Sequence, residues 1–176
     1  FVPVLGEYRE KGSQAALKEL TNRVFGTLGA TLLLLTLVIV IASPLFAALF
    51  APKWYFNDGF KFNATAEMLR ITFPYLLFIS MTGVAGGILN SYDRFAVPAF
   101  TPVLLNLSLI FAALIAAPWF DQPTYALAWG VFAAGAIQFC FQLPFLARLH
   151  MLPVPVVDWK HPGVRKILGL MGPAIF

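Results

Sequence analysis

Charged side chains are scarce in this sequence. Only 11% of its 176 residues are Asp, Glu, Lys or Arg, whereas 60% are hydrophobic, and the mean hydropathy is +0.80. A soluble domain normally carries about 25% charged residues, so the composition argues against a water-soluble protein. A soluble protein with several buried helices is the alternative, and the spacing of the charges disfavours it.

Cysteine and histidine are scarce too, which limits the available chemistry. The one cysteine, Cys140, excludes an intrachain disulfide, and we expect it to pack as a small apolar residue. His150 and His161 lack the Cys or carboxylate spacing of a metal site. The sequence also has no Walker loop and no GxGxxG motif. We therefore expect no catalytic residue, no metal and no cofactor, which argues against an enzyme.

Four long stretches contain no charged residue at all. They occupy residues 24–52, 71–92, 95–120 and 122–147, and each is 22 to 29 residues long. About 20 apolar residues suffice for a helix to cross the hydrocarbon core of a bilayer. The sequence therefore predicts an all-α protein, a polytopic transmembrane helix bundle whose charges lie between the spans.

We expect residues 1–176 to form part of one transmembrane domain. The predicted transmembrane helices are 24–50, 67–90, 99–117 and 124–149. The predicted connections are 1–23 (the end of a span, then a cytoplasmic segment along the membrane surface), 51–63 (a loop), 150–162 (a cytoplasmic loop) and 163–176 (the start of the next helix). Thr65 is expected to cap the second helix. Both ends of the sequence resemble parts of further helices, so we expect an internal piece of a longer protein.

Basic residues are distributed unevenly between the gaps. If alternate gaps lie on alternate sides, one side holds only Lys53, Lys61 and Arg70. The other side holds nine, namely Arg9, Lys11, Lys18, Arg23, Arg94, Arg148, Lys160, Arg165 and Lys166. Cytoplasmic loops carry an excess of Lys and Arg, so the nine-residue side is predicted to be cytoplasmic. A position at the membrane surface is sufficient to explain the basic residues and the net charge of +4. We therefore expect no nucleic-acid partner.

Uncharged polar side chains inside the predicted spans are the candidate substrate-binding residues. Asn106 lies in the third span, and Gln138 and Gln142 share one face of the fourth because they are four residues apart. Polar groups are unfavourable in lipid unless they find partners. One interpretation is therefore hydrogen bonding between helices, and the other is that some of these side chains line a polar pathway. Ser80 and Thr82 in the second span are open to the same two interpretations.

Small residues and prolines also recur in the spans. Gly83 with Gly87, and Gly130 with Ala134, have the spacing that allows two membrane helices to approach closely. Prolines in the spans or near their ends, at positions 44, 74, 102 and 144, are expected to bend or end helices. Such bending is compatible with a transporter. No span has a charge at its centre, so charges that bind an anionic substrate would have to lie elsewhere.

Several short motifs follow one another in a specific order. They are FVPVLGEY at 1–8, ITFPY at 71–75, GILNSYDRF at 87–95, PAFTPVLLN at 98–106, QLP at 142–144 and MGPAI at 171–175. Together they resemble the MurJ (MviN-type) lipid II flippases of the MOP exporter superfamily, over essentially the whole chain. The resemblance implies a polytopic α-helical protein with two lobes around a central cavity, of which this chain would be most of the N-terminal lobe.

The resemblance also implies a function and partners. The family moves lipid II, the undecaprenyl-linked precursor used in peptidoglycan synthesis and cell wall biogenesis, from the inner to the outer leaflet of the bacterial inner membrane by alternating access. Lipid II and membrane lipids would be the partners, while the residues favour no particular oligomeric state. The cavity arginines of the family map outside this chain, and Arg94, which matches a basic residue in a family turn, is expected to serve topology.

Three other functions remain open on the sequence alone. They are another MOP-type exporter of drugs or polysaccharide lipids, a membrane-embedded enzyme acting on prenyl phosphates, and a structural scaffold. The enzyme would need charged or His-containing motifs at the membrane edges, and the short outer loops offer few. The scaffold would leave the pattern of prolines unexplained.

Overall fold

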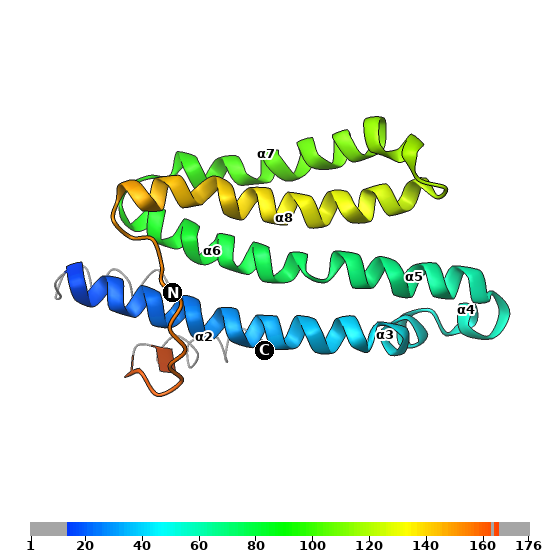
Figure 1. Cartoon of the computed structure of the whole chain (residues 1–176), viewed down its shortest axis with the longest axis horizontal. Coiled ribbons are helices and arrows are strands. Elements are labelled where there is room, and N and C mark those ends of the chain that lie inside the picture. The colour runs from blue at the N-terminus through cyan, green and yellow to red at the C-terminus, as the bar shows by residue number, and fades with distance from the viewer. Residues whose placement is uncertain (1–13, 163, 166–176) are drawn as a thin grey trace. The chain divides into compact units, whose positions relative to one another are not determined.

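The computed structural model describes residues 14–162, 164 and 165, and within this part of the chain every regular element is helical (Figure 1). The α-helices are α2 (Gln14–Ile41), α3 (Ser43–Phe50), α4 (Pro52–Asn57), α5 (Gly59–Thr72), α6 (Tyr75–Ser91), α7 (Ala96–Phe111) and α8 (Pro123–Arg148). A π-helical stretch, η1 (Ala112–Ala116), and a 3-10 turn, η2 (Ala117–Trp119), follow α7.

Within the described residues, four helical segments are long and apolar enough to cross a membrane. They are Gln14–Ile41, Gly59–Ser91, Ala96–Trp119 and Pro123–Arg148. The prediction of an all-α polytopic bundle is thus confirmed, and the chain is a multi-pass membrane protein. The boundaries at which each span meets the bilayer stay predictions. The expected span end before residue 14, the motifs at 1–8 and 171–175, and most of the expected helix at 163–176 lie outside the described residues.

The chain divides into two compact units. Unit 1 contains the described parts of Phe1–Thr31, Ser80–Phe100 and Phe139–Phe176, and unit 2 contains Leu32–Ile79 and Thr101–Gln138. The divisions fall inside long helices, so each unit is assembled from segments that are distant in the sequence. All contacts described below lie within one unit or the other.

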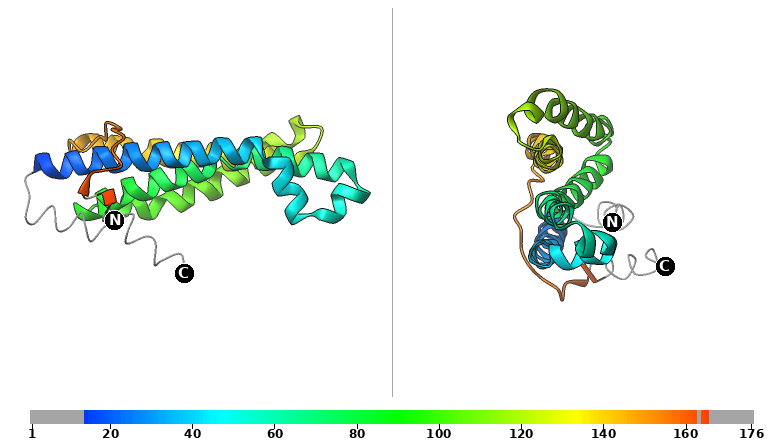
Figure 2. Two further views of the ribbon diagram at one scale, coloured as in Figure 1. Left: turned by 90° about the horizontal axis from the view of Figure 1, so that it is seen from below. Right: turned by 90° about the vertical axis from the view of Figure 1, so that its right-hand side faces the viewer.

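The segment predicted to be a loop at 51–63 is mostly helical, so that prediction was wrong. Pro52 occupies the first turn of α4, where its missing N–H is no loss. The Asp58 carboxylate then caps α5 by accepting a hydrogen bond from the Lys61 backbone N–H at 3.1 Å. Thr65 lies inside α5, where its hydroxyl donates to the Lys61 carbonyl, so it is not the cap. Figure 2 shows these short helices in cyan.

The start of α2 lies ahead of the first predicted span. Residues 14–23 belong to the segment that was expected to be a helix-compatible connection along the membrane surface, and they form one continuous helix with the residues of the first predicted span. The helix breaks at Ala42, just before α3. Pro44 explains this break, because it has no N–H to continue the helical hydrogen bonds.

Within unit 2, glycines allow α8 to pack closely on its neighbours, and α7 and α8 lie side by side (Figure 1). A Cβ added at Gly130 would lie 2.7 Å from the Ala112 Cβ, and the Ser108 hydroxyl donates to the Gly130 carbonyl at 2.9 Å. A Cβ added at Gly135 would approach the side chains of Tyr75 and Phe78 about as closely. These contacts support the prediction of close packing at Gly130, whereas a Cβ at Gly83 would meet nothing within 4 Å among the described residues.

Substituting these two glycines should therefore have opposite effects. Gly130→Ala should destabilise the protein by about 1–3 kcal/mol, because the new methyl group overlaps Ala112. Gly83→Ala should be neutral or stabilising by up to about 1 kcal/mol, because alanine favours a helix more than glycine does. The measurement is the apparent melting temperature of the full-length protein in detergent. Equal melting temperatures for the two variants would contradict the tight contact at Gly130.

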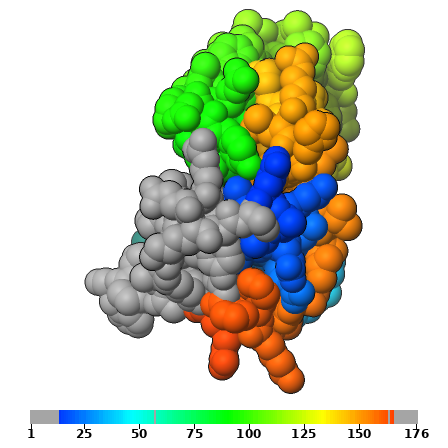
Figure 3. Space-filling view, turned by 90° about the vertical axis from the view of Figure 1, so that its left-hand side faces the viewer, coloured from blue at the N-terminus to red at the C-terminus, as the bar shows by residue number. Residues whose placement is uncertain are grey.

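Within unit 1, residues 151–158 form an extended segment, here called the strap, that lies against α2 (Figure 3). The Asn22 side chain accepts a hydrogen bond from the Val154 N–H at 2.8 Å, and its backbone carbonyl accepts one from Val156 at 3.1 Å. The Thr27 hydroxyl accepts a third from the Asp158 N–H at 2.9 Å. Three backbone donors of the strap are thus satisfied by α2, which leaves little freedom in how the strap runs.

An ion pair reinforces the end of the strap. Arg23 bonds both Glu19, one turn earlier on α2, and the Asp158 carboxylate. The pKa of Asp158 lies below its ordinary value of 3.8, mainly because the Lys160 backbone N–H donates to the carboxylate and also because Arg23 is nearby. A carboxylate with a lowered pKa stays charged at neutral pH, so the ion pair persists there.

Candidate functional site

Gln142, on the part of α8 that belongs to unit 1, is a buried amide without a partner. Its side chain is 1% exposed, and neither its Oε1 nor its Nε2 makes a hydrogen bond among the described residues. The Nε2 lies near Gly86 of α6, since a Cβ added there would be 3.7 Å from it and 3.2 Å from Pro98 of α7. Gly86 therefore provides the space that the amide occupies.

Thr82 adds a second polar group to this region of α6. It lies one turn before Gly86 and is 3% exposed, and its hydroxyl also has no partner among the described residues. Buried polar groups in proteins nearly always have partners, so each exception calls for an explanation. Gln142 and Thr82 offer uncharged donors and acceptors that a polar substrate or water molecules could use.

Gln138 has a different environment, in unit 2. Its side chain is also 1% exposed, but its Nε2 donates to the backbone carbonyl of Thr101 on α7 at 2.7 Å. Its Oε1 has no partner within the described part of the chain. The amide therefore links two helices, as the interhelical interpretation of these residues requires, while half of its hydrogen-bonding capacity remains unused.

Asn106, the third candidate, is exposed on α7. It is not buried with either glutamine, and its side chain makes no hydrogen bond to any of the described residues. The helix around it is also open, because only 11% of the most apolar stretch of Ala96–Trp119 is buried, against 33–39% in the other three spans. Asn106 is thus available to lipid or to protein outside this chain.

Two polar links in unit 2 were not expected from the sequence. The Arg70 Nε donates to the Ser43 hydroxyl at 2.7 Å, which joins α5 to α3. The Tyr125 hydroxyl donates to the Glu67 carboxylate at 2.5 Å, which joins α8 to α5. The sequence places Arg70 and Glu67 near the start of the second predicted span, but nothing in their spacing reveals contacts 27 and 58 residues away.

The candidate residues are chemically simple. Amides and hydroxyls donate and accept hydrogen bonds, but they do not titrate near neutral pH and they carry no charge. Among residues 14–162, 164 and 165, no three His, Cys, Asp or Glu side chains lie close enough to hold a metal ion. What the site can do is hydrogen-bond a polar group inside a helix bundle.

Comparison with known proteins identifies the family. The family model described as lipid II flippase MurJ matches residues 1–176. The chain belongs to the MurJ family. The resemblance carried by the ordered motifs is thereby confirmed over the whole chain.

Individual relatives of the MurJ family agree. The chain is 42% identical over 182 residues to the probable lipid II flippase MurJ of Haemophilus influenzae and 44% identical over 182 residues to that of Vibrio cholerae. It is 40% identical over 180 residues to the lipid II flippase MurJ of Burkholderia cenocepacia. Each alignment covers 100% of this chain but only 35–36% of the relative, so the chain spans about a third of the length of these MurJ proteins.

Proposed function

We propose that this chain forms part of a flippase that moves lipid II from the inner to the outer leaflet of the bacterial inner membrane. The observation that carries the proposal is the match to the MurJ family along all 176 residues, together with relatives named lipid II flippases. The protein would be a transporter, and peptidoglycan synthesis would be the process it serves. No observation favours a drug or polysaccharide exporter, a prenyl-phosphate enzyme or a scaffold.

The chemistry of the spans is compatible with this function. A lipid-linked sugar with a pyrophosphate cannot cross hydrocarbon unaided, because each polar group would lose its hydrogen bonds to water. A path through the protein must supply replacement partners. Gln142 and Thr82 have unused donors and acceptors, and Gln138 has an unused acceptor. We propose that Gln142 and Thr82, which lie in unit 1, belong to the wall of the path, and that exposed Asn106 faces lipid or another part of the protein.

The orientation follows the distribution of basic residues. We propose that the nine-residue basic side, which includes Arg94 and Arg148, is cytoplasmic. The spans would then be 24–50, 67–90, 99–117 and 124–149 within one transmembrane domain. Under this proposal the strap lies on the cytoplasmic side, where it follows the fourth span.

The test is to deplete the full-length protein from the bacterium that encodes it and to measure how lipid II is distributed between the leaflets. We expect lipid II to accumulate in the inner leaflet, and expression of the full-length protein from a plasmid to restore the distribution. Lipid-linked polysaccharide precursors are measured in the same cells. Their accumulation in place of lipid II would indicate an exporter of polysaccharide lipids instead. An unchanged lipid II distribution, in cells from which the protein has disappeared, would reject the proposal.

A further inference from the structure

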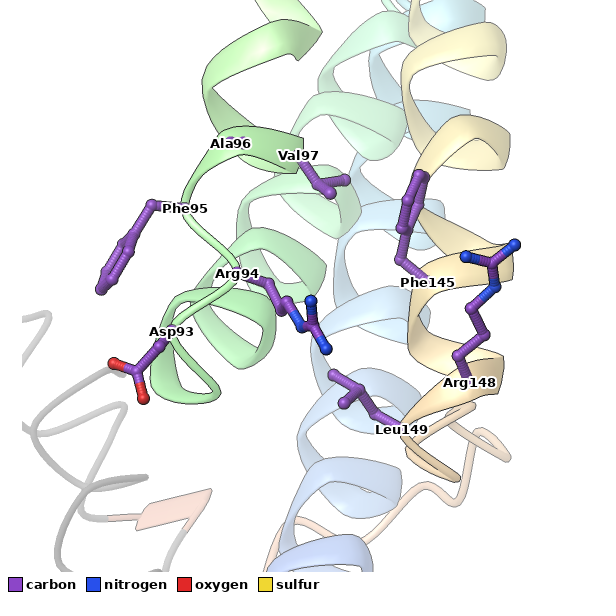
Figure 4. A pocket seen from close by; sticks show the side chains of 8 residues that line it. All are labelled: Asp93, Arg94, Phe95, Ala96, Val97, Phe145, Arg148 and Leu149. Carbon is purple, nitrogen blue, oxygen red and sulfur yellow. The ribbon is translucent and has the colours of Figure 1, made fainter.

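A cavity in unit 1 lies between the start of α7 and the end of α8. It has a volume of about 330 Å³, and its wall includes Arg94, Val97, Phe145, Arg148 and Leu149 (Figure 4). The wall combines one arginine from each side, Arg94 and Arg148, with apolar side chains from both sides. The residues come from the ends of two predicted spans, so the cavity is expected at the membrane edge.

The two arginines of this cavity have no acidic partner in the described part of the chain, where none of the observed ion pairs involves Arg94 or Arg148. Arg148 lies over the Phe145 ring, with its Cζ 5.9 Å from the ring centre. Asp93 also borders the cavity, but Figure 4 shows its carboxylate directed away from both guanidinium groups. Two positive charges thus share one opening, and none of the residues that the structure describes supplies a counter-ion.

Both arginines are held by well-defined helix ends. At the end of α6, the Arg94 N–H donates to the Leu89 carbonyl and the Asp93 N–H to that of Asn90, with Asp93 in the left-handed conformation (φ 61°). This pattern is a Schellman motif. The same motif ends α8 just beyond Arg148, where His150 has φ 56° and the Met151 N–H donates to Leu146. The backbone on each side of the opening is therefore fixed.

The N-terminus of α7 adds to the positive potential. Its first turn contains no acidic residue, and the backbone N–H groups of Ala96 and Val97 have no acceptor among the described residues. Such groups carry the positive end of the helix dipole and favour an anion. With two guanidinium groups, which suit phosphate oxygens, the cavity has the donors that a phosphate requires.

The apolar part of the wall decides which kind of phosphate fits. Val97, Phe145 and Leu149 line the cavity beside the arginines, and Phe95 at its edge is 59% exposed. A free phosphate would use only the cationic part, whereas a lipid would place its headgroup there and its hydrocarbon along the apolar part. We propose that this cavity binds the phosphate group of a membrane lipid. The phosphate could come from a phospholipid or from a polyprenyl pyrophosphate. The prenyl source rests on the proposed function, because lipid II is itself prenyl-linked, whereas the phospholipid source does not.

Binding can be measured on the purified full-length protein in detergent, with short-chain phosphatidylglycerol, a short polyprenyl pyrophosphate and inorganic phosphate as separate probes. Replacing both arginines (Arg94→Gln with Arg148→Gln) should weaken lipid binding by about tenfold or more, because charge-assisted hydrogen bonds are lost. The matched control is Lys18→Gln with Lys160→Gln, which removes two exposed charges from the same predicted side. This control should bind the lipids as the original protein does.

The outcomes separate the possibilities. Tighter binding of phosphatidylglycerol supports a phospholipid, and tighter binding of the prenyl pyrophosphate supports a prenyl lipid. Equal losses in the arginine and lysine variants would overturn the proposal, and so would inorganic phosphate binding as tightly as either lipid. Arg94→Lys with Arg148→Lys should keep most of the affinity. If the glutamine variant melts at a lower temperature, its loss of binding could reflect unfolding. The lysine variant then decides the question: if it binds the lipids, the proposal is supported, and if it does not bind them, the proposal is overturned.

Discussion

Replacing Gly26 by alanine should detach the strap from α2. A Cβ at this position would lie 2.3 Å from the backbone N, C and O atoms of Val156, and backbone cannot rotate away as the end of a side chain can. Overpacking of this kind typically costs about 1–3 kcal/mol. The overlap would occur at the part of α2 where three hydrogen bonds hold the strap. The measurement is the distance between spin labels at Lys18 and Trp159, which should become longer and broader in distribution.

Gly29→Ala is the matched control for this prediction. Gly29 lies one turn further along α2, and a Cβ there would be 3.6 Å from the Met81 sulfur, which is an ordinary contact with a flexible side chain. The label distances should therefore remain those of the original protein. Both measurements need the full-length protein in a background free of other cysteines, with Cys140 replaced by alanine. If Gly26→Ala leaves the distances unchanged, the strap does not lie on Gly26 in the membrane.

The strap also shows how a local substitution could affect transport. Under the proposed orientation it follows the fourth span directly, so α2 would fix the path along which the chain leaves this set of helices. Asn22, Thr27 and Arg23 hold the strap by separate interactions, whereas Gly26 only provides space. Loss of Gly26 should thus be more damaging than loss of any one hydrogen bond, and transport by the full-length protein should fall with it.

The main features of the fold were predictable from the sequence because charge is excluded from hydrocarbon. The four uncharged stretches indicated four long apolar helices, and the part of the chain that the structure describes contains four such helical segments. The ordered motifs were sufficient to predict the MurJ family. These features depend on composition and local order, both of which can be recognised without knowing any contact.

Features that depend on distant contacts were not predictable. Gly26 gives no local sign that residue 156 lies against it, while the Gly83–Gly87 spacing suggested a contact at Gly83 that is absent among the described residues. The prediction of a loop at 51–63 failed because Asp58 acts as a helix cap rather than as a turn residue. Helical spacing put Gln138 and Gln142 on one face, but only the structure shows that one is bonded and the other is not.

Replacing Gln142 by methionine should stabilise the protein and impair transport. Both polar atoms of the Gln142 amide are buried without partners among the described residues, and an unsatisfied buried polar group typically costs about 1–3 kcal/mol. Methionine has a similar length and no amide to satisfy, so the apparent melting temperature of the full-length protein should rise. Transport of lipid II should nevertheless fall, because the proposed path would lose a donor and an acceptor. Melting in detergent and the leaflet distribution of lipid II in cells are the two measurements.

Gln138→Met is the matched comparison, one turn earlier on α8. It removes a hydrogen bond to the Thr101 carbonyl, so it should destabilise the protein by about 0.5–1.5 kcal/mol. A purely structural role for both glutamines would leave transport intact in the more stable Gln142 variant. A functional role for Gln142 predicts that its methionine variant is more stable but transports less. General damage to the fold cannot produce this result, because it would lower the stability as well. Full transport by Gln142→Met would therefore remove this residue from the proposed path.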